Sequence, residues 1–542
     1  MSTTIYSARR IHTLDPRCPE ASHVAVRDGR IVGVGTLTTL PAGLGPTVID
    51  TRFADKVLLP GFVEGHAHAD AGIVWRYAYC GQYERRDPAG RLWPPVHNIS
   101  AILERVRHSL ASSRINGTIF AWGIDPIHLD RPPSRRDLDE VSSSEPVALI
   151  NASGHILYLN TEALRRVNLL EPGFIHGGLP RASDGLAVGE LRGSELIGPA
   201  AQLLGISEAL QGSDCDALLD FARLCVQTGV TTVTDLANPL TEPTLAAIQE
   251  ITRTPQWPVR LVPALYGQGK PVAQLFARLL DLRAHSHELL RLGQFKLVMD
   301  GSIQGFTARL RASGYVNGAP NGLWYVAPEW VREVMVAALQ SGVPLHIHTN
   351  GDEASDLALN LLEQALSLAP VSGHRVILQH AQLMDEGLMR RARDLGAGVN
   401  LFSNHIYYWG DAHAAQTVGA ARAAQMNAAA TAQRLGLPFS IHSDVPVTPM
   451  APLFTAWCAV NRITSKGMVL GPPECLTVPQ ALHAITLGGA HTLGLEREIG
   501  SISIGKSADF AVLHDDPLGV APEQLKDVGV WGTVCHGRVS AA

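Results

Sequence analysis

The chain has 542 residues, 46% of them hydrophobic and 17% charged, which is enough for a large core domain and at least one smaller one. Its net charge of -6 and pI near 6.4 provide no basic surface for nucleic acid or an anionic membrane, so we expect neither as a partner. No stretch has the apolar length of a secretory signal or a membrane span, so the expected location is cytoplasmic. The seven cysteines form no C-x-x-C pair, which argues against a thiolate zinc site.

Both ends of the chain carry patterns typical of short β-strands joined by turns. The runs 4–14 and 23–34 alternate apolar and polar residues, and Asp28-Gly29 inside the second run is a strong hairpin signal. The segments 500–514 and 528–539 show the same pattern near the other end. We therefore expect residues 1–57 and 496–542 to build one small β domain together.

Residues 58–495 predict strands and helices in regular alternation, after a long insertion at about 70–225. Eight short apolar segments predict strands, at 59–66, 231–235, 259–265, 294–299, 343–348, 375–380, 397–401 and 437–442. Helical patterns between them, as at 216–228, 328–341, 354–368 and 384–395, require successive strands to run parallel. Eight such units predict an α/β fold, the (β/α)8 or TIM barrel, whose functional residues lie at the carboxyl ends of the strands. An open doubly wound sheet would usually show a glycine-rich turn after its first strand, and none is present.

Polar side chains recur at the ends of these apolar strands. The set is His66, His68, Lys296, His348, His380 and Asp444. His66 and His68 are two residues apart, so on a strand they point to the same side and can occupy two corners of a metal site. Lys296 lies within an apolar strand, where a bare ammonium group is costly unless it is paired or its charge is changed.

Each of these residues also has an ordinary structural interpretation. A single histidine at a strand end is more often a hydrogen-bonded core residue, and Asp444 could cap the next helix. Six such residues at one rim are much less easily explained in that way, and they predict a metal site. His346 shares a face with His348; we assign the ligand to His348, which is nearer the strand end, and a supporting or core role to His346.

Short motifs follow one another along nearly the whole chain. They are Leu59-Pro60-Gly61-Phe62 with His66-Ala67-His68, Ser153-Gly154-His155 with Asn160, Gly229-Val230-Thr231-Thr232, Phe295-Lys296 with Asp300-Gly301-Ser302, His348 with Gly351-Asp352, Gln379-His380-Ala381-Gln382, Asn404-His405 with Trp409-Gly410-Asp411, His442-Ser443-Asp444-Val445-Pro446-Val447 and Gly505-Lys506-Ser507-Ala508-Asp509-Phe510. In this order they resemble the metal-dependent amidohydrolase superfamily, in the branch of N-substituted formamide deformylases and related uncharacterised amidohydrolases.

This resemblance implies a barrel with one or two divalent metal ions, commonly zinc, flanked by a β-sandwich made from both chain ends. His66 and His68 resemble ligands of the first ion, and His348 and His380 resemble ligands of the second. Lys296 resembles a lysine that becomes N-carboxylated in many relatives, which turns a buried cation into an anion able to bridge two ions.

The resemblance also implies the chemistry. A metal-bound hydroxide would attack the substrate carbonyl, and Asp444, also a ligand, would act as general base and then as general acid. His155 and His405 resemble residues that hold the oxyanion or the substrate. Trp324 and Tyr408 are aromatic candidates for the wall of an apolar pocket.

The expected activity is hydrolysis of a non-peptide amide-type C–N bond in a small molecule, with an N-substituted amide or formamide as the substrate class. The stretch 300–307 departs from many relatives, so the substrate itself stays open. Lactone, ester, phosphoester and cyclic amide hydrolysis also stay open, because a bridged hydroxide serves them all. A deaminase would usually carry a glutamate three residues after the histidine of the fifth strand, where His348 is followed by Thr349-Asn350-Gly351. A metal-binding protein without turnover is a further alternative, and a homodimer is open as its assembly.

Overall fold

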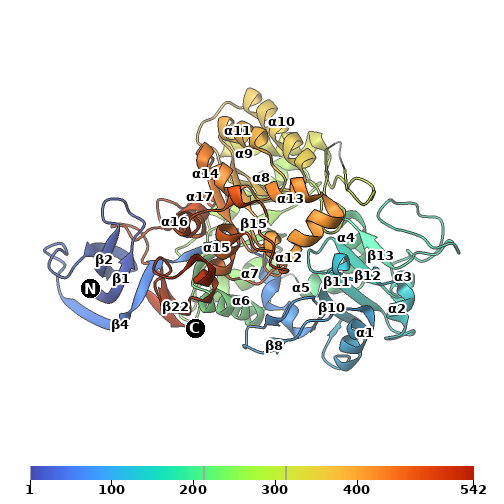
Figure 1. The fold of residues 1–542 in the computed structure, drawn as a ribbon, viewed down its shortest axis with the longest axis horizontal. Coiled ribbons are helices and arrows are strands. Elements are labelled where there is room, and N and C mark those ends of the chain that lie inside the picture. The colour runs from blue at the N-terminus through green and yellow to red at the C-terminus, as the bar shows by residue number, and fades with distance from the viewer. Residues whose placement is uncertain (1, 211–213, 312–313) are drawn as a thin grey trace.

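A barrel of eight parallel strands forms the centre of the computed structural model, which describes residues 2–210, 214–311 and 314–542 (Figure 1). The strands follow one another around the barrel in chain order, as β5 (Phe62–Glu64), β14 (Val230–Asn238), β15 (Arg260–Tyr266), β16 (Gln294–Val298), β17 (Leu345–Thr349), β18 (Val376–His380), β19 (Gly398–Leu401) and β20 (Phe439–Ile441). These strands are almost entirely buried, which explains why they are continuous apolar runs in the sequence. The predicted barrel is confirmed.

The barrel closes between its first and last strands, next to the histidine pair. An isolated parallel bridge joins Ala67 to Val445. The backbone N–H of Asp444 donates to the carbonyl of His66 at 3.1 Å, and the N–H of His68 donates to the carbonyl of Val445 at 2.9 Å. Closure therefore places residues almost 380 positions apart in the chain side by side.

Helices follow the barrel strands and pack on their outer face. They include α6 (Cys215–Gln227), α7 (Glu242–Ile251), α8 (Val272–Arg283), α9 (Pro328–Ser341), α10 (Asp352–Leu368), α11 (Glu386–Asp394) and α14 (Ala429–Leu435). Helix α9 shows why the sequence predicts these elements well: it begins at Pro328, whose fixed backbone suits the first turn, and it is terminated by Gly342, which follows Ser341 in the left-handed conformation. Its observed bounds are the predicted ones.

The two ends of the chain meet in one mixed sheet of seven strands. In spatial order it contains β23 (Arg538–Ala541), β22 (Val530–Cys535), β21 (Phe510–Leu513), β4 (Thr47–Pro60), β1 (Thr3–His12), β2 (Glu20–Arg27) and β3 (Arg30–Gly35). Strand β4 leads directly into the barrel at Gly61, where a Cβ atom would lie only 2.0 Å from Thr231 Oγ1. Only glycine allows β5 to approach β14 this closely. That residues 1–57 and 496–542 form a separate β-sandwich domain with these limits remains a prediction.

A buried ion pair fastens the terminal sheet to the barrel. Arg260 on β15 pairs with Asp509, and the two side chains are 1% and 3% exposed. Arg260 also donates to Ser507 Oγ at 3.1 Å and to the carbonyl of Glu288 at 2.9 Å. Removing one partner leaves a buried charge uncompensated.

We therefore expect Asp509→Asn to lower the free energy of unfolding by about 3–5 kcal/mol, measured by urea denaturation. Asp55→Asn is the matched control, because Asp55 is 75% exposed and its pair with Lys56 should contribute less than about 1 kcal/mol. Equal midpoints for the two variants would contradict this role of the Arg260 pair.

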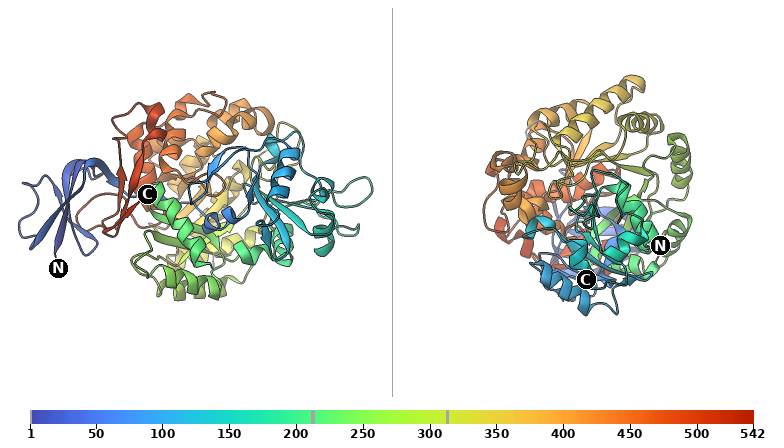
Figure 2. Two further views of the ribbon diagram at one scale, coloured as in Figure 1. Left: turned by 90° about the horizontal axis from the view of Figure 1, so that it is seen from below. Right: turned by 90° about the vertical axis from the view of Figure 1, so that its right-hand side faces the viewer.

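The insertion folds around a sheet of its own, at the opposite end of the barrel from the terminal sheet (Figures 1 and 2). Its strands are β6 (Ala78–Tyr79), β9 (Arg114–Ile115), β10 (Thr118–Ile124), β11 (Val147–Asn151), β12 (Ile156–Leu159) and β13 (Glu190–Arg192), accompanied by helices α1 (Ile99–His108), α2 (Arg135–Asp139), α3 (Thr161–Arg166), α4 (Ser194–Leu203) and α5 (Ile206–Leu210). Across the described residues, no helix has the length and apolar character needed to cross a bilayer.

Candidate metal centre

All six residues predicted as a metal site line one cavity of about 450 Å³. They come from the carboxyl ends of the barrel strands β5, β16, β17, β18 and β20 or from the residues just after them. Parallel strands bring their carboxyl ends to the same rim, which is why positions so distant in the chain converge.

One compact group consists of His66, His68 and Asp444. Asp444 Oδ1 lies 3.4 Å from His66 Nε2 and 3.3 Å from His68 Nε2, and the three ligand atoms lie within 4.8 Å of one another. Asp444 Oδ1 is buried without a good hydrogen-bond partner among the described residues. Two imidazoles and one carboxylate are donors that zinc accepts in catalytic sites, so this group fits a divalent ion.

The electrostatics of this group favour a neutral His66 and an ionised Asp444, the forms in which these two side chains bind metals, whereas the raised pKa of His68 means that a cation would have to displace a proton from its ring. Burial lowers the pKa of His66 well below the usual value, so its imidazole is neutral. Burial acts to raise the pKa of Asp444, but the His68 ring 3.3 Å from its Oδ1 outweighs burial, and the pKa is lowered. For His68 burial acts to lower the pKa, while the Asp444 carboxylate raises it.

Lys296 is buried at the floor of the cavity, with its Nζ 3.4 Å from His66 Nε2. Burial lowers the pKa of Lys296 to about 7, although the Asp444 carboxylate acts in the opposite direction. A large share of this lysine is therefore a neutral amine near neutral pH, which is a nucleophile and does not repel a cation.

His348 and His380 stand beside this group, with ring centroids 4.4 Å apart. His380 Nδ1 lies 3.7 Å from Asp444 Oδ2. His348 Nδ1 lies 3.2 Å from Asp300 Oδ1, and Asp300 is itself held by the backbone N–H groups of Asn350 and Gly351, both at 2.9 Å. This carboxylate orients the His348 ring, as outer residues commonly do for metal-binding histidines.

His442 is an additional imidazole that we did not predict as a site residue. It is fully buried two residues before Asp444, and neither of its ring nitrogens has a partner within the described part of the chain. One nitrogen each of His66, His380 and His442 lies within 4.8 Å of the others. However, the His66 and His442 rings are stacked at 22°, and one ion cannot lie in two nearly parallel ring planes, so the group with Asp444 fits an ion better. The sequence does contain a signal for His442 as a site residue, because the spacing of His442 and Asp444 is the same as that of His66 and His68.

Of the two further histidines that we predicted to hold the substrate, only His155 lines the cavity. Its ring centroid lies 5.3 Å from that of His348, and its Nδ1 lies 3.5 Å from Tyr325 Oη. His405 is buried outside the lining, where its Nδ1 lies 3.0 Å from His413 Nε2 and its ring packs against Phe402.

Neither predicted aromatic residue reaches the cavity. Trp324 packs under the guanidinium group of Arg309 at 5.0 Å, and its neighbour Tyr325 lines the cavity instead. Tyr408 packs against Tyr83, with ring centroids 4.7 Å apart. The wall is supplied largely by the insertion, through Trp122 on β10, Ile150 on β11 and Ile197 on α4, whose approach to the barrel could not be read from sequence periodicity.

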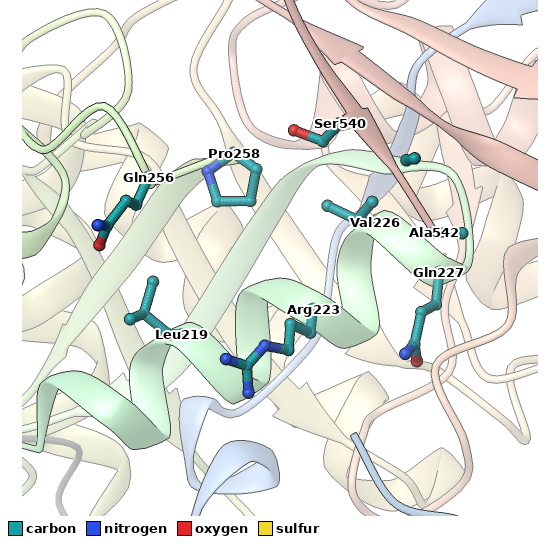
Figure 3. Close-up of a pocket in the computed structure, with 9 residues that line it drawn as sticks. Leu219, Arg223, Val226, Gln227, Gln256, Pro258, Ser540 and Ala542 are labelled. Carbon is teal, nitrogen blue, oxygen red and sulfur yellow. The ribbon is translucent and has the colours of Figure 1, made fainter. Parts of the chain in front are cut away.

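A second cavity, of about 480 Å³, lies between helix α6 and the last residues of the chain (Figure 3). Its described lining includes Leu219, Arg223, Val226, Gln256 and Pro258, and contains no histidine, cysteine, lysine or acidic side chain. The groups of histidine and carboxylate side chains among the described residues lie instead at the barrel rim.

Comparisons with known proteins agree with this geometry. Residues 53–541 match the model of the amidohydrolase family. The chain is 27% identical over 527 residues to protein LONG AFTER FAR-RED 3 of Arabidopsis thaliana, covering 93% of this chain and 85% of that protein. It is 25% identical over 545 residues to N-substituted formamide deformylase of Arthrobacter pascens, covering 97% and 96%.

The fold resembles the crystal structure of an uncharacterised metal-dependent hydrolase from Pyrococcus horikoshii, with a TM-score of 0.73 and 20% identity. The match covers 96% of this chain and 99% of that one. Because the family model covers most of the chain, and the site lies at the rim of the expected barrel, the protein is a member of the amidohydrolase family.

Proposed function

We propose that this protein hydrolyses a non-peptide amide-type C–N bond, in the class of N-substituted amides or formamides. The observation that carries this proposal is the group of His66, His68 and Asp444, with the buried Lys296 amine 3.4 Å from His66 Nε2, in one cavity at the barrel rim. The similarity to N-substituted formamide deformylase supports the substrate class.

The residues present suit one or two zinc ions. His66, His68 and Asp444 would hold the first ion, and His348 and His380, with Lys296 N-carboxylated, would hold the second. When bound, such an ion supplies Lewis acidity, which polarises a carbonyl group and lowers the pKa of a water molecule.

Asp444 would transfer a proton from the attacking water to the leaving nitrogen. Its carboxylate stays ionised because its pKa is lowered, and it borders the cavity between His66, His68 and His380. It can accept a proton from the attacking water and deliver it to the leaving nitrogen. His155 is neutral because burial lowers its pKa to about 3, so it can offer a hydrogen bond to the substrate carbonyl oxygen without a charge of its own.

The remaining cavity wall favours an uncharged substituent. Trp122, Ile150 and Ile197 make this wall apolar, and Lys296 is the only lysine or arginine in the described lining. Asp70 and Asp444 add negative charge. A carboxylate on the substituent, which would face this wall and not the metal ions, would be desolvated without a cationic partner, which is unfavourable.

We therefore expect kcat/KM for an N-alkylformamide to exceed that for its ω-carboxylate analogue by about 100-fold or more, since an unpaired buried charge costs about 3–5 kcal/mol. Ile197→Arg should reduce this preference at least about tenfold by pairing the carboxylate. Ile197→Met keeps the wall apolar and should preserve it. Equal turnover of both substrates by the unaltered protein would contradict an apolar wall.

The proposed activity itself is tested by a substrate screen on zinc-loaded protein. The panel contains N-acyl amines, formamides, hydantoin-like rings and lactones, and amine release is measured separately from ring opening. Fastest turnover of formamides or N-substituted amides supports the proposal, whereas faster lactone opening would contradict it.

A further inference from the structure

A line of buried, hydrogen-bonded side chains runs beneath the metal centre. Gln294 on β16, His346 on β17 and Gln379 on β18 lie on three neighbouring parallel strands, and each is at most 5% exposed. The line begins at the backbone carbonyl of Leu493 and ends at His66. Its successive contacts measure 3.0, 2.7, 2.8 and 2.7 Å.

The carbonyl at one end determines the direction of every hydrogen bond in this line. Because a carbonyl only accepts, the Gln294 amide nitrogen must donate to Leu493. The Gln294 oxygen therefore faces His346 Nε2, which must carry the proton and donate. His346 Nδ1 is then an acceptor and receives the Gln379 amide N–H.

The last step sets the tautomer of His66. With its nitrogen directed at His346, Gln379 turns its oxygen to His66 Nδ1, which must donate. Asn400 donates a second hydrogen bond to the same oxygen at 2.9 Å. Exchanging the amide nitrogen and oxygen of either glutamine would be unfavourable. One of its two contacts would then join two donors, and the other would join two acceptors. His66 Nε2 is thereby left as a lone pair facing Asp444 and Lys296.

We propose that the Leu493 carbonyl fixes the metal-binding tautomer of His66 through this polarised relay, with Gln379 as its positioning residue. The inference rests on the proposed role of His66 as a ligand. It also gives His346 a function: both of its ring nitrogens are engaged in the relay, so it supports the centre and does not bind the ion.

The test is the dissociation constant of zinc, measured by chelator competition without substrate. Gln379→Leu removes the acceptor for His66 Nδ1 and should weaken binding by about 10- to 100-fold. Gln379→Glu keeps an acceptor for His66 Nδ1 and should retain most of the affinity, with a proton taken up by His346 Nδ1 to meet the second carboxylate oxygen. Thr486→Val is the control for the loss of a buried hydrogen bond elsewhere, because Thr486 is buried in the helical segment Ala484–Gly488 and its hydroxyl donates to the carbonyls of Leu482 and His483.

A double-mutant cycle separates the relay from simple packing. Gln294→Leu should weaken zinc binding in the original background, because His346 and Gln379 are then free to reverse. In the Gln379→Glu background it should not weaken zinc binding, since the carboxylate accepts from His66 Nδ1 whichever ring nitrogen of His346 carries the proton. Additive losses, or unchanged affinity in a folded Gln379→Leu protein, would overturn the proposal; the cycle still decides if that variant fails to fold.

A metal-free readout distinguishes this inference from the proposed function. Two-bond ¹H–¹⁵N spectra of histidine-labelled protein should show His66 with its proton on Nδ1, assigned by comparison with His66→Gln. Predominant Nε2–H in the apo protein would overturn the relay. Absence of amidase activity alongside Nδ1–H and tight zinc binding would contradict only the proposed function.

Discussion

Asp444→Asn should lower kcat by about 10²- to 10⁴-fold, the range for losing a general acid and base. Asparagine has the shape of aspartate, yet it cannot accept the proton of the attacking water or return it to the leaving nitrogen. Metal content and kcat should be measured on the same sample, so that loss of an ion is separated from loss of proton transfer. The side chain contacts His66, His68 and His380, so some loss of metal is also expected.

Asp385→Asn is the matched control for this substitution. Asp385 caps helix α11 away from the cavity, and its side chain is 51% exposed. Its asparagine variant should retain turnover and metal, because asparagine also caps helices well. A fully metallated Asp444→Asn protein with undiminished kcat would disprove the proposed role of this carboxylate.

Replacing Lys296 by methionine should prevent carboxylation and lower activity at least about 100-fold, the upper range for disturbing a metal environment through one residue. Methionine fills the buried space of the lysine stem but has no amine to react with carbon dioxide. Protein reconstituted with zinc and ¹³C-bicarbonate should show a carbamate signal by ¹³C NMR that is lost in Lys296→Met. Lys506→Met should keep the signal, because Lys506 lies outside the cavity and donates to the Ile499 carbonyl.

The pH dependence of this modification follows from the lowered pKa of Lys296, about 7 in the folded chain against 10.5 ordinarily. Carbon dioxide reacts with the neutral amine, so incorporation of label should rise as the pH increases through about 7. Between the two values the unfolded chain binds a proton that the folded chain lacks, so the stability of the metal-free protein should also rise with pH there. A bare amine in metal-replete protein would refute carboxylation.

The sequence was sufficient to predict the barrel because its strands are short and buried on both faces. Such strands appear as continuous apolar runs between amphipathic helices, and eight of them could be counted directly. Parallel pairing then determines the rim at which strand ends meet. For this reason His66, Lys296, His348, His380 and Asp444 could be grouped in advance, and the structure places all of them in one cavity.

The cavity wall could not be predicted in this way. Trp324 and Tyr325 are adjacent in the chain, but only Tyr325 faces the cavity, because the packing of Arg309 on Trp324 decides their orientation. The sheet of the insertion was not predicted as a whole either, because β6 pairs with β10 and β12 with β13 across long segments without a regular alternation of strand and helix. Tertiary contacts therefore decide which substituents the site can accept.

By itself, then, the sequence determined the barrel, the rim and most of the residues that can bind a metal, because strand periodicity and parallel register are local properties repeated along the chain. The tertiary structure alone decided the rest. It showed that His442 stacks on His66, that the insertion builds the apolar wall, and that Leu493 is linked to His66 through three buried side chains. These features depend on contacts between residues far apart in the chain, which no local pattern records.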